Sequence, residues 1–101
     1  MKTISIISGD KRQFYIKEYL KNNGYNADII TNMDFNNTDI IVAGTPFVKN
    51  DAYINCDYYT GFPVDTFLGL LKPKQIVFAG SISEDIMKLC PKNIKLIDVL
   101  K

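Results

Sequence analysis

The stretch T-I-S-I-I-S-G-D-K-R-Q-F-Y-I-K-E-Y-L, residues 3–20, decides the fold of this chain. It begins with Ile4–Ile7, a run rich in β-branched residues that is typical of a strand. A polar segment with one glycine, Ser8–Gln13, follows, and apolar residues then recur at helical spacing from Ile16 to Leu20. The stretch therefore predicts a strand, a polar turn and a helix. In open α/β sheets, ligands bind where such strands end.

The alternation of strand and helix patterns continues beyond this stretch. Four more apolar runs of strand length follow, at Ala27–Thr31, Asp39–Ala43, Gln75–Ala79 and Lys95–Val99. Helical spacing recurs in two further segments, Val64–Leu71 and Ile82–Cys90. Short connections of this kind favour a parallel sheet with right-handed crossovers and with helices on both faces. We expect one three-layer α/β domain, flavodoxin-like or Rossmann-like, with a mainly parallel sheet of about five strands in the order 2-1-3-4-5.

Two segments depart from the alternation. Asn32–Thr38 is a short polar link in place of a crossover helix, and Phe47–Phe62 is the longest irregular segment. Within the latter, Ala52–Cys56 is a candidate for a sixth, short strand. Its aromatic residues either dock a partner protein or a second copy of the chain, or cover one edge of the sheet as part of a small core.

Size and composition exclude several classes of protein. The 101 residues allow one domain, and 47% hydrophobic with 23% charged residues is the balance of an ordinary globular fold. The net charge of +1 and the scattered lysines argue against nucleic-acid binding. No apolar run approaches the roughly 20 residues of a bilayer span, and no leader precedes the first strand, so we expect a cytoplasmic protein without a membrane anchor.

The cysteines offer no metal site. Cys56 and Cys90 lie far apart in the sequence, form no C-x-x-C motif and have no histidine anywhere in the chain to complete a zinc set. We expect reduced thiols that fill space, and no bound metal. Without histidine the chain also lacks the usual proton shuttle near neutral pH, so a complete catalytic triad is not expected.

Three turns follow predicted strands and form the candidate site: Ser8–Gln13, Gly44–Phe47 and Gly80–Ser83. Each has a glycine for close backbone approach, and the last two bring hydroxyl groups. Next to the start of a helix, free N–H groups favour an anion such as a carboxylate or phosphate. The sequence thus predicts a site for a small acidic molecule at this edge.

Arg12 is the residue of most interest, because a guanidinium in the first turn of a helix can form paired hydrogen bonds with a carboxylate. It equally suits a solvated helix face or an ion pair with Glu18. Gln13 can add a hydrogen bond to the ligand, or Asp10 and Gln13 can form a capping box that satisfies the N–H groups of the helix.

The other two turns also have structural explanations. Ser81 and Glu84 fit the S-x-x-E capping box. Thr45 and Pro46 are either an N-cap with proline at the first helical position or a turn that faces a ligand. Asp98 ends the last apolar run and is expected at the surface.

Three known α/β chemistries fit the turns poorly. The dinucleotide motif G-x-G-x-x-G needs glycines where this chain has Lys11 and Phe14. The phosphate loop of flavodoxins is built from hydroxyls and glycine, whereas Gly9–Gln13 holds an acid, two bases and an amide. Receiver domains place an aspartate after the third strand, where this chain has Gly44-Thr45.

The segment S-G-D-K-R-Q, residues 8–13, resembles the G-D-x-R-Q start of the dipicolinate synthase A-subunit family. The segments Q-I-V-F-A-G-S-I-S (75–83) and K-L-I-D (95–98) are similar to later parts of that family. The resemblance implies the N-terminal, substrate-side domain of a two-domain oxidoreductase of spore-forming bacteria. This enzyme would use NADP to form dipicolinate from a dihydrodipicolinate-type precursor during sporulation, in the cytoplasm of the mother cell.

The resemblance also implies which partners and residues take part. NADP would be bound by a C-terminal Rossmann domain absent from this chain, which alone is not expected to be active, and the dipicolinate synthase B-subunit and a small dicarboxylate would be partners. The substrate cleft would be lined by Asp10, Arg12, Gln13, Thr45, Gly80 and Ser81. The alternative is a stand-alone α/β binding or protein-interaction module without catalytic activity, with a homodimer as one form.

Overall fold

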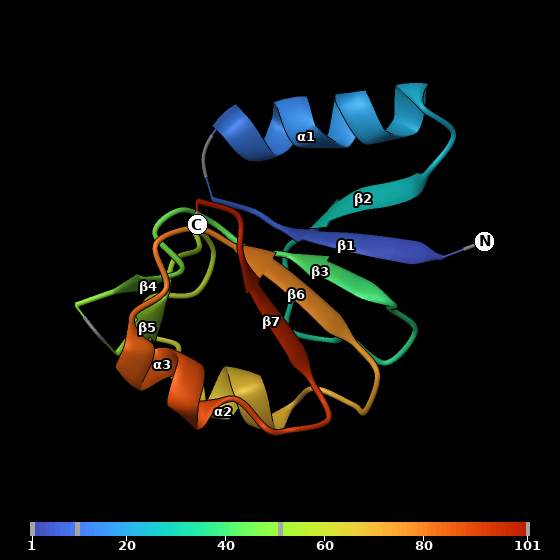
Figure 1. Cartoon of the computed structure of the whole chain (residues 1–101). Helices are drawn as coiled ribbons and strands as arrows, with labels where there is room; N and C mark the ends of the chain where they lie inside the picture. The colour runs from blue at the N-terminus through green and yellow to red at the C-terminus, as the bar shows by residue number, and fades with distance from the viewer. Residues whose placement is uncertain (1, 10, 51, 101) are drawn as a thin grey trace.

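The computed structural model describes residues 2–9, 11–50 and 52–100. Its main sheet has five parallel strands in the order β2-β1-β3-β6-β7 (Figure 1). They are β1 (Thr3–Ile7), β2 (Asn26–Ile30), β3 (Ile40–Val42), β6 (Ile76–Ala79) and β7 (Lys95–Asp98). In chain order these five strands are arranged 2-1-3-4-5, which confirms the predicted α/β fold and its strand order.

Three helices flank the sheet, α1 (Lys11–Asn22), α2 (Val64–Gly69) and α3 (Glu84–Leu89). Figure 1 shows α1 on one face of the sheet, with α2 and α3 on the other. The helix α1 covers the β1–β2 half of its face. The expected helices on both faces of the sheet are thus confirmed.

The segment between β3 and α2 forms a separate two-stranded antiparallel ribbon, β4 (Val48–Lys49) with β5 (Tyr53–Ile54). The strand β5 lies within the predicted short strand at residues 52–56, whereas β4 was not predicted because two residues carry no periodic pattern. No helix begins at Thr45-Pro46, since the chain continues from there into β4. The N-cap alternative for Thr45 is therefore wrong.

The larger core lies between the sheet and the two short helices. Phe67 of α2 is fully buried there, and its ring packs edge-on against Phe35 and Phe47, with ring centroids 5.3 and 5.8 Å apart. Phe47 and Phe62 are also buried in this cluster. These phenylalanines of the aromatic segment thus belong to the core, where each large ring removes apolar surface from water.

Gln75 explains how the short polar link between β2 and β3 is held. Its buried amide donates to the carbonyl oxygens of Phe35 and Thr38, at 2.7 and 2.8 Å. A buried amide with two acceptors satisfies its own donors and fixes the loop without a crossover helix.

Candidate functional site

The carboxyl ends of β1, β3 and β6 meet at one edge of the sheet, as the predicted site requires. Arg12, in the first turn of α1, donates from Nη2 to the carbonyl oxygen of Thr45 at 2.9 Å. This contact joins the β1–α1 turn to the β3–β4 turn, across 33 residues of sequence. The guanidinium is exposed, so it is held at the edge while open to solvent.

Gly80 completes this edge from the neighbouring strand. Its backbone N–H donates to the carbonyl of Gly44 at 3.3 Å, and its own carbonyl accepts from the N–H of Phe47 at 2.8 Å. A Cβ atom at position 80 would lie 2.7 Å from Cγ2 and 2.9 Å from Cβ of Thr45. The close approach of the two turns therefore requires glycine here. Arg12, Thr45, Gly80 and Ser81 all lie along this edge.

The turn after β6 differs from the predicted anion site. The backbone N–H groups of Ser81 and Ile82 donate to Oδ1 and Oδ2 of Asp98, at 3.2 and 2.9 Å. Asp98 was expected to be a surface residue, but it is half-buried and its carboxylate takes the position that a bound anion would take. These two N–H groups are therefore satisfied within the chain.

The predicted capping box of Ser81 and Glu84 is also wrong. The N-cap of α3 is Ser83, whose hydroxyl accepts from the N–H of Ile86 at 3.3 Å. Ser83 has the extended backbone of an N-cap residue, whereas Ser81 has φ +55°, in the left-handed region. The side chain of Ser81 is exposed on the edge.

Gln13 is buried beneath the β1–α1 turn, with 4% of its surface exposed. A Cβ atom added to Gly9 would lie 3.6 Å from the amide of Gln13, so this side chain packs directly against the backbone of the turn. The structure thus places Gln13 behind the edge. Asp10, its predicted partner in a capping box, lies outside the described residues.

Two residues of the irregular segment reach this edge and were not predicted. Ser8 donates from Oγ to Oδ2 of Asp57 at 3.0 Å, and the N–H of Asp57 donates to the carbonyl of Ser8 at 3.0 Å. Asn55 donates to the carbonyl of Pro46 at 2.8 Å and lies against Gly44. No local pattern marks these partners, because they are far from the strand ends in sequence.

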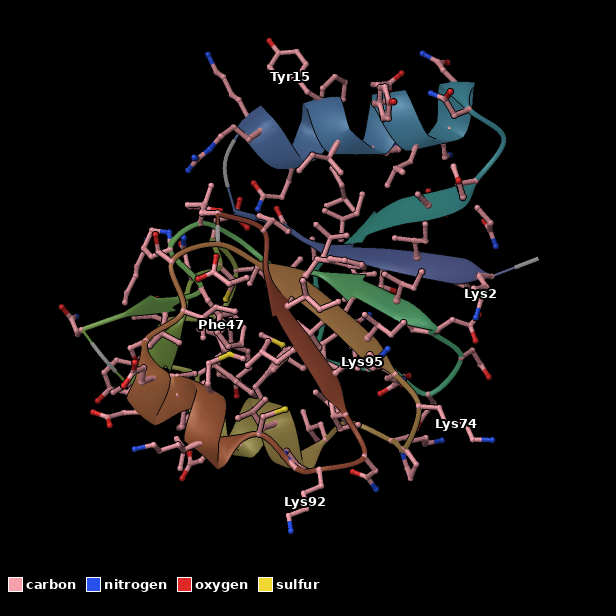
Figure 2. All side chains as sticks on the ribbon, viewed as in Figure 1. Lys2, Tyr15, Phe47, Lys74, Lys92 and Lys95 are labelled. Carbon is pink, nitrogen blue, oxygen red and sulfur yellow. The ribbon has the colours of Figure 1, made fainter. Side chains whose placement is uncertain are left out.

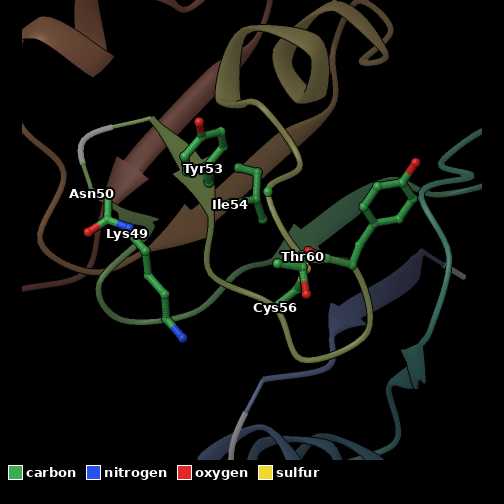
Figure 3. Close-up of a pocket in the computed structure, with 8 residues that line it drawn as sticks. Lys49, Asn50, Tyr53, Ile54, Cys56 and Thr60 are labelled. Atoms are coloured by element: carbon green, nitrogen blue, oxygen red, sulfur yellow. Dashed lines mark hydrogen bonds between the residues drawn. The ribbon is translucent and has the colours of Figure 1, made fainter.

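A pocket of about 430 Å³ lies on the β4–β5 ribbon. Figure 3 shows Lys49 and Asn50 on one side of it and Cys56 and Thr60 on the other. Its lining comprises Lys49, Asn50, Tyr53, Ile54, Cys56, Tyr59, Thr60 and Gly61. None of the predicted site residues that the structure describes, Arg12, Gln13, Thr45, Gly80 and Ser81, lines this pocket, so it is distinct from the Arg12 edge.

Tyr58 and both cysteines are partly buried and pack against the core. Tyr58 donates from its hydroxyl to the carbonyl of Asn32 at 2.8 Å. Burial, and to a smaller extent the neighbouring Cys56 and Asp57, raise the pKa of Tyr58 well above its ordinary value. Both cysteines are free thiols packed against the core, and burial raises the pKa of Cys90, which disfavours its nucleophilic thiolate form.

The described part of the chain lacks the features of a metal site or a membrane span. Across residues 2–9, 11–50 and 52–100, no group of three or more cysteine, histidine or acidic side chains could hold a metal ion. The helices found in these same ranges are not long and apolar enough to cross a bilayer.

The strand order, the layers and the position of the site together define a doubly wound α/β domain of the flavodoxin-like or Rossmann-like type. Two solved structures share this fold over 99% of the chain. The A chain of dipicolinate synthase from Bacillus subtilis has a TM-score of 0.74 and 15% identity. The dipicolinate synthase A-subunit from Bacillus halodurans has a TM-score of 0.71 and 16% identity.

These similarities confirm the predicted resemblance to the dipicolinate synthase A-subunit at the level of the fold. The chain spans only 40% and 41% of the lengths of the two Bacillus chains. No protein-family model and no curated protein matches the sequence.

Proposed function

We propose that this chain is the N-terminal, substrate-side domain of an oxidoreductase related to the dipicolinate synthase A-subunit. It would contribute to NADP-dependent formation of dipicolinate from a dihydrodipicolinate-type precursor during sporulation. The observation that carries the proposal is the exposed guanidinium of Arg12, held by Thr45 at the carboxyl edge of a sheet with the fold of two dipicolinate synthase structures.

The edge suits a small dicarboxylate. A guanidinium is a charged N–H donor whose planar shape matches a carboxylate. The hydroxyl groups of Thr45 and Ser81 would orient the ligand from the neighbouring turns. Because Asp98 accepts from the N–H of Ser81, we assign ligand binding to the hydroxyl of Ser81 and not to its backbone. Gln13 would support the turn from behind.

The residues of this domain do not fit a dinucleotide. Lys11 and Phe14 stand where the fingerprint of the β1–α1 turn needs glycines for close approach to a pyrophosphate. We therefore assign NADP to a C-terminal Rossmann domain of a longer polypeptide. The dipicolinate synthase B-subunit would be a further partner, in the cytoplasm of the mother cell.

The test of the site uses the assembled enzyme. Arg12→Ala should lower kcat/KM by about tenfold or more, since a hydrogen bond to a charged group contributes roughly 1.5 to 3 kcal/mol. Lys92→Ala removes one positive charge from an exposed position that Figure 2 places far from Arg12's helix, and it should leave kcat/KM unchanged. An unaltered kcat/KM in Arg12→Ala would refute the role of Arg12.

The test of the domain assignment is the size of the native protein. An immunoblot of source cells with an antibody raised to this domain should detect a product about two and a half times as long as this chain, as in the Bacillus subtilis protein. A native product of 101 residues would contradict the two-domain enzyme. It would favour the stand-alone binding module, with the pocket on the β4–β5 ribbon as its candidate site.

A further inference from the structure

The ribbon pocket, the cavity of about 430 Å³ on β4 and β5, has no role in the proposed function. Its volume lies within the range of roughly 300 to 1,000 Å³ that is typical of sites for small molecules. Two segments of the chain enclose it, the β4–β5 ribbon and the turn at residues 59–61 (Figure 3). The side chains of these two segments indicate which kind of molecule would fit.

The ribbon places a positive charge beside an aromatic ring. Lys49 and Tyr53 are register partners in the antiparallel pair, so their side chains lie on the same face of the ribbon. Residues directly opposite each other in such a pair have Cβ atoms about 5 Å apart. Both side chains are exposed, whereas Ile54, which also lines the pocket, is buried. The ribbon therefore contributes an ammonium group and a ring on an apolar base.

The turn on the other side is fixed by contacts within the chain. Tyr59 packs edge-on against the buried ring of Phe62, with ring centroids 4.9 Å apart. The thiol of Cys56 donates to the carbonyl oxygen of Tyr59 at 3.3 Å. The N–H of Ile54 donates to the carbonyl oxygen of Phe62 at 2.8 Å, which ties the end of the turn to the ribbon. Both sides of the pocket are thus held in place without a ligand, as in most small-molecule sites.

The charge of the pocket comes from Lys49. Among the described residues that line the pocket, Lys49 is the only one with a charged side chain. Within the same described part of the chain, its ammonium group has no ion-pair or hydrogen-bond partner. A concave surface that carries charge of one sign attracts ligands of the opposite sign. The pocket therefore favours a ligand with a negative charge.

The two tyrosines indicate the shape of that ligand. Tyr53 belongs to the ribbon and Tyr59 to the turn, and their side chains are 41% and 52% exposed. Aromatic rings pack favourably on other rings in offset or edge-to-face arrangements. A flat ring between the ribbon and the turn would remove part of both tyrosines from water.

We propose that the ribbon pocket binds a small aromatic carboxylate, with the carboxylate at Lys49 and the ring against Tyr53 and Tyr59. One ammonium group matches the single charge of a carboxylate better than the charge of nearly two on a phosphate group. The hydroxyl of Thr60 and the amide of Asn50 are further hydrogen-bond donors in the lining. This site is separate from the Arg12 edge, so its failure would leave the proposed function unaffected.

Benzoate is the probe in an NMR titration of the 101-residue chain. We expect saturable shifts at the backbone amides of Lys49, Tyr53 and Thr60 with a Kd of about 1 mM. Benzamide has nearly the same shape without the charge, and acetate has the charge without the ring. Both should bind at least about tenfold more weakly than benzoate. Equally strong binding of either compound would overturn the proposal.

Variants locate the binding site. Lys49→Ala changes an exposed side chain and should weaken benzoate binding about tenfold, whereas Lys49→Arg keeps the charge and should restore it. Lys92→Ala is the matched control, because Lys92 is an exposed lysine outside the lining, and it should leave the Kd unchanged. Arg12→Ala should also leave it unchanged. Native affinity in Lys49→Ala overturns the proposal, and so does the absence of shifts at the pocket up to about 20 mM benzoate.

Discussion

The carboxylate of Asp98, at the end of β7, accepts a hydrogen bond of 2.9 Å from the backbone N–H of Ile82, in the turn that follows β6. The same carboxylate accepts from the N–H groups of Ser81 and Leu100, at 3.2 and 2.9 Å. The sequence predicted that the N–H groups of this turn bind an anion. They donate instead to a carboxylate of the chain itself. The proposed ligand site depends on Arg12 and on side-chain hydroxyls for this reason.

Asp98→Ala should destabilise the domain, because it leaves backbone N–H groups without their acceptor. Losing such partners costs roughly 1 to 3 kcal/mol, which should appear as a lower urea midpoint with an unchanged slope. Asp28→Ala is the control, since Asp28 takes part in an exposed ion pair of 3.3 Å with Lys21 and should change stability by less than about 1 kcal/mol. Equal midpoints in the two variants would show that the turn does not need Asp98.

Gly80→Ala should destabilise the domain by about 1 to 3 kcal/mol, because the new methyl group would overlap the side chain of Thr45. Thermal unfolding measures the effect. Gly69→Ala is the matched control. It lies in α2 with nothing within 4 Å of an added Cβ, and replacing a helical glycine by alanine should raise stability by roughly 0.5 to 1 kcal/mol. If both variants were equally stable, the close approach of the two turns would be disproved.

Tyr58 should make stability fall at alkaline pH. Its pKa is raised in the folded protein, so its contribution is complete below the unfolded pKa of about 10 and is lost as pH rises above that value, where only the unfolded state releases the proton. Tyr58→Phe should flatten this decline in urea unfolding series at increasing pH. Tyr15→Phe, at an exposed position, should not change it. An identical alkaline decline in both variants would contradict the assignment to Tyr58.

Dipicolinate should bind the isolated chain at the Arg12 edge. In an NMR titration, we expect the largest shifts at the backbone amides of Arg12, Thr45 and Gly80, and Arg12→Ala should abolish them. Arg12→Lys keeps the positive charge but lacks the planar guanidinium, so this variant should bind dipicolinate more weakly than the native chain. Shifts centred instead on Lys49 and Thr60 would point to the ribbon pocket as the binding site.

Much of the architecture was predictable because its causes are local. Each of the five strands is an apolar run of a few residues, and the spacing of Ile16 and Leu20 marks the inner side of α1. Right-handed crossovers then restrict how such elements can be arranged, so the strand order 2-1-3-4-5 followed from their succession. The turns at the carboxyl edge were predictable for the same reason, because each comes directly after one of these strands.

The details of the site were not predictable, because they depend on partners distant in sequence. Asp98 lies 16 residues from its partner Ile82. Asp57 lies 49 residues from Ser8, and Arg12 lies 33 residues from Thr45. A hydrogen bond requires positions correct to a fraction of an ångström, which only the packed sheet provides. The sequence by itself therefore determined the order of the elements and the edge where a site would lie. Tertiary structure decided which N–H groups were already satisfied and which half of one sheet face α1 covers.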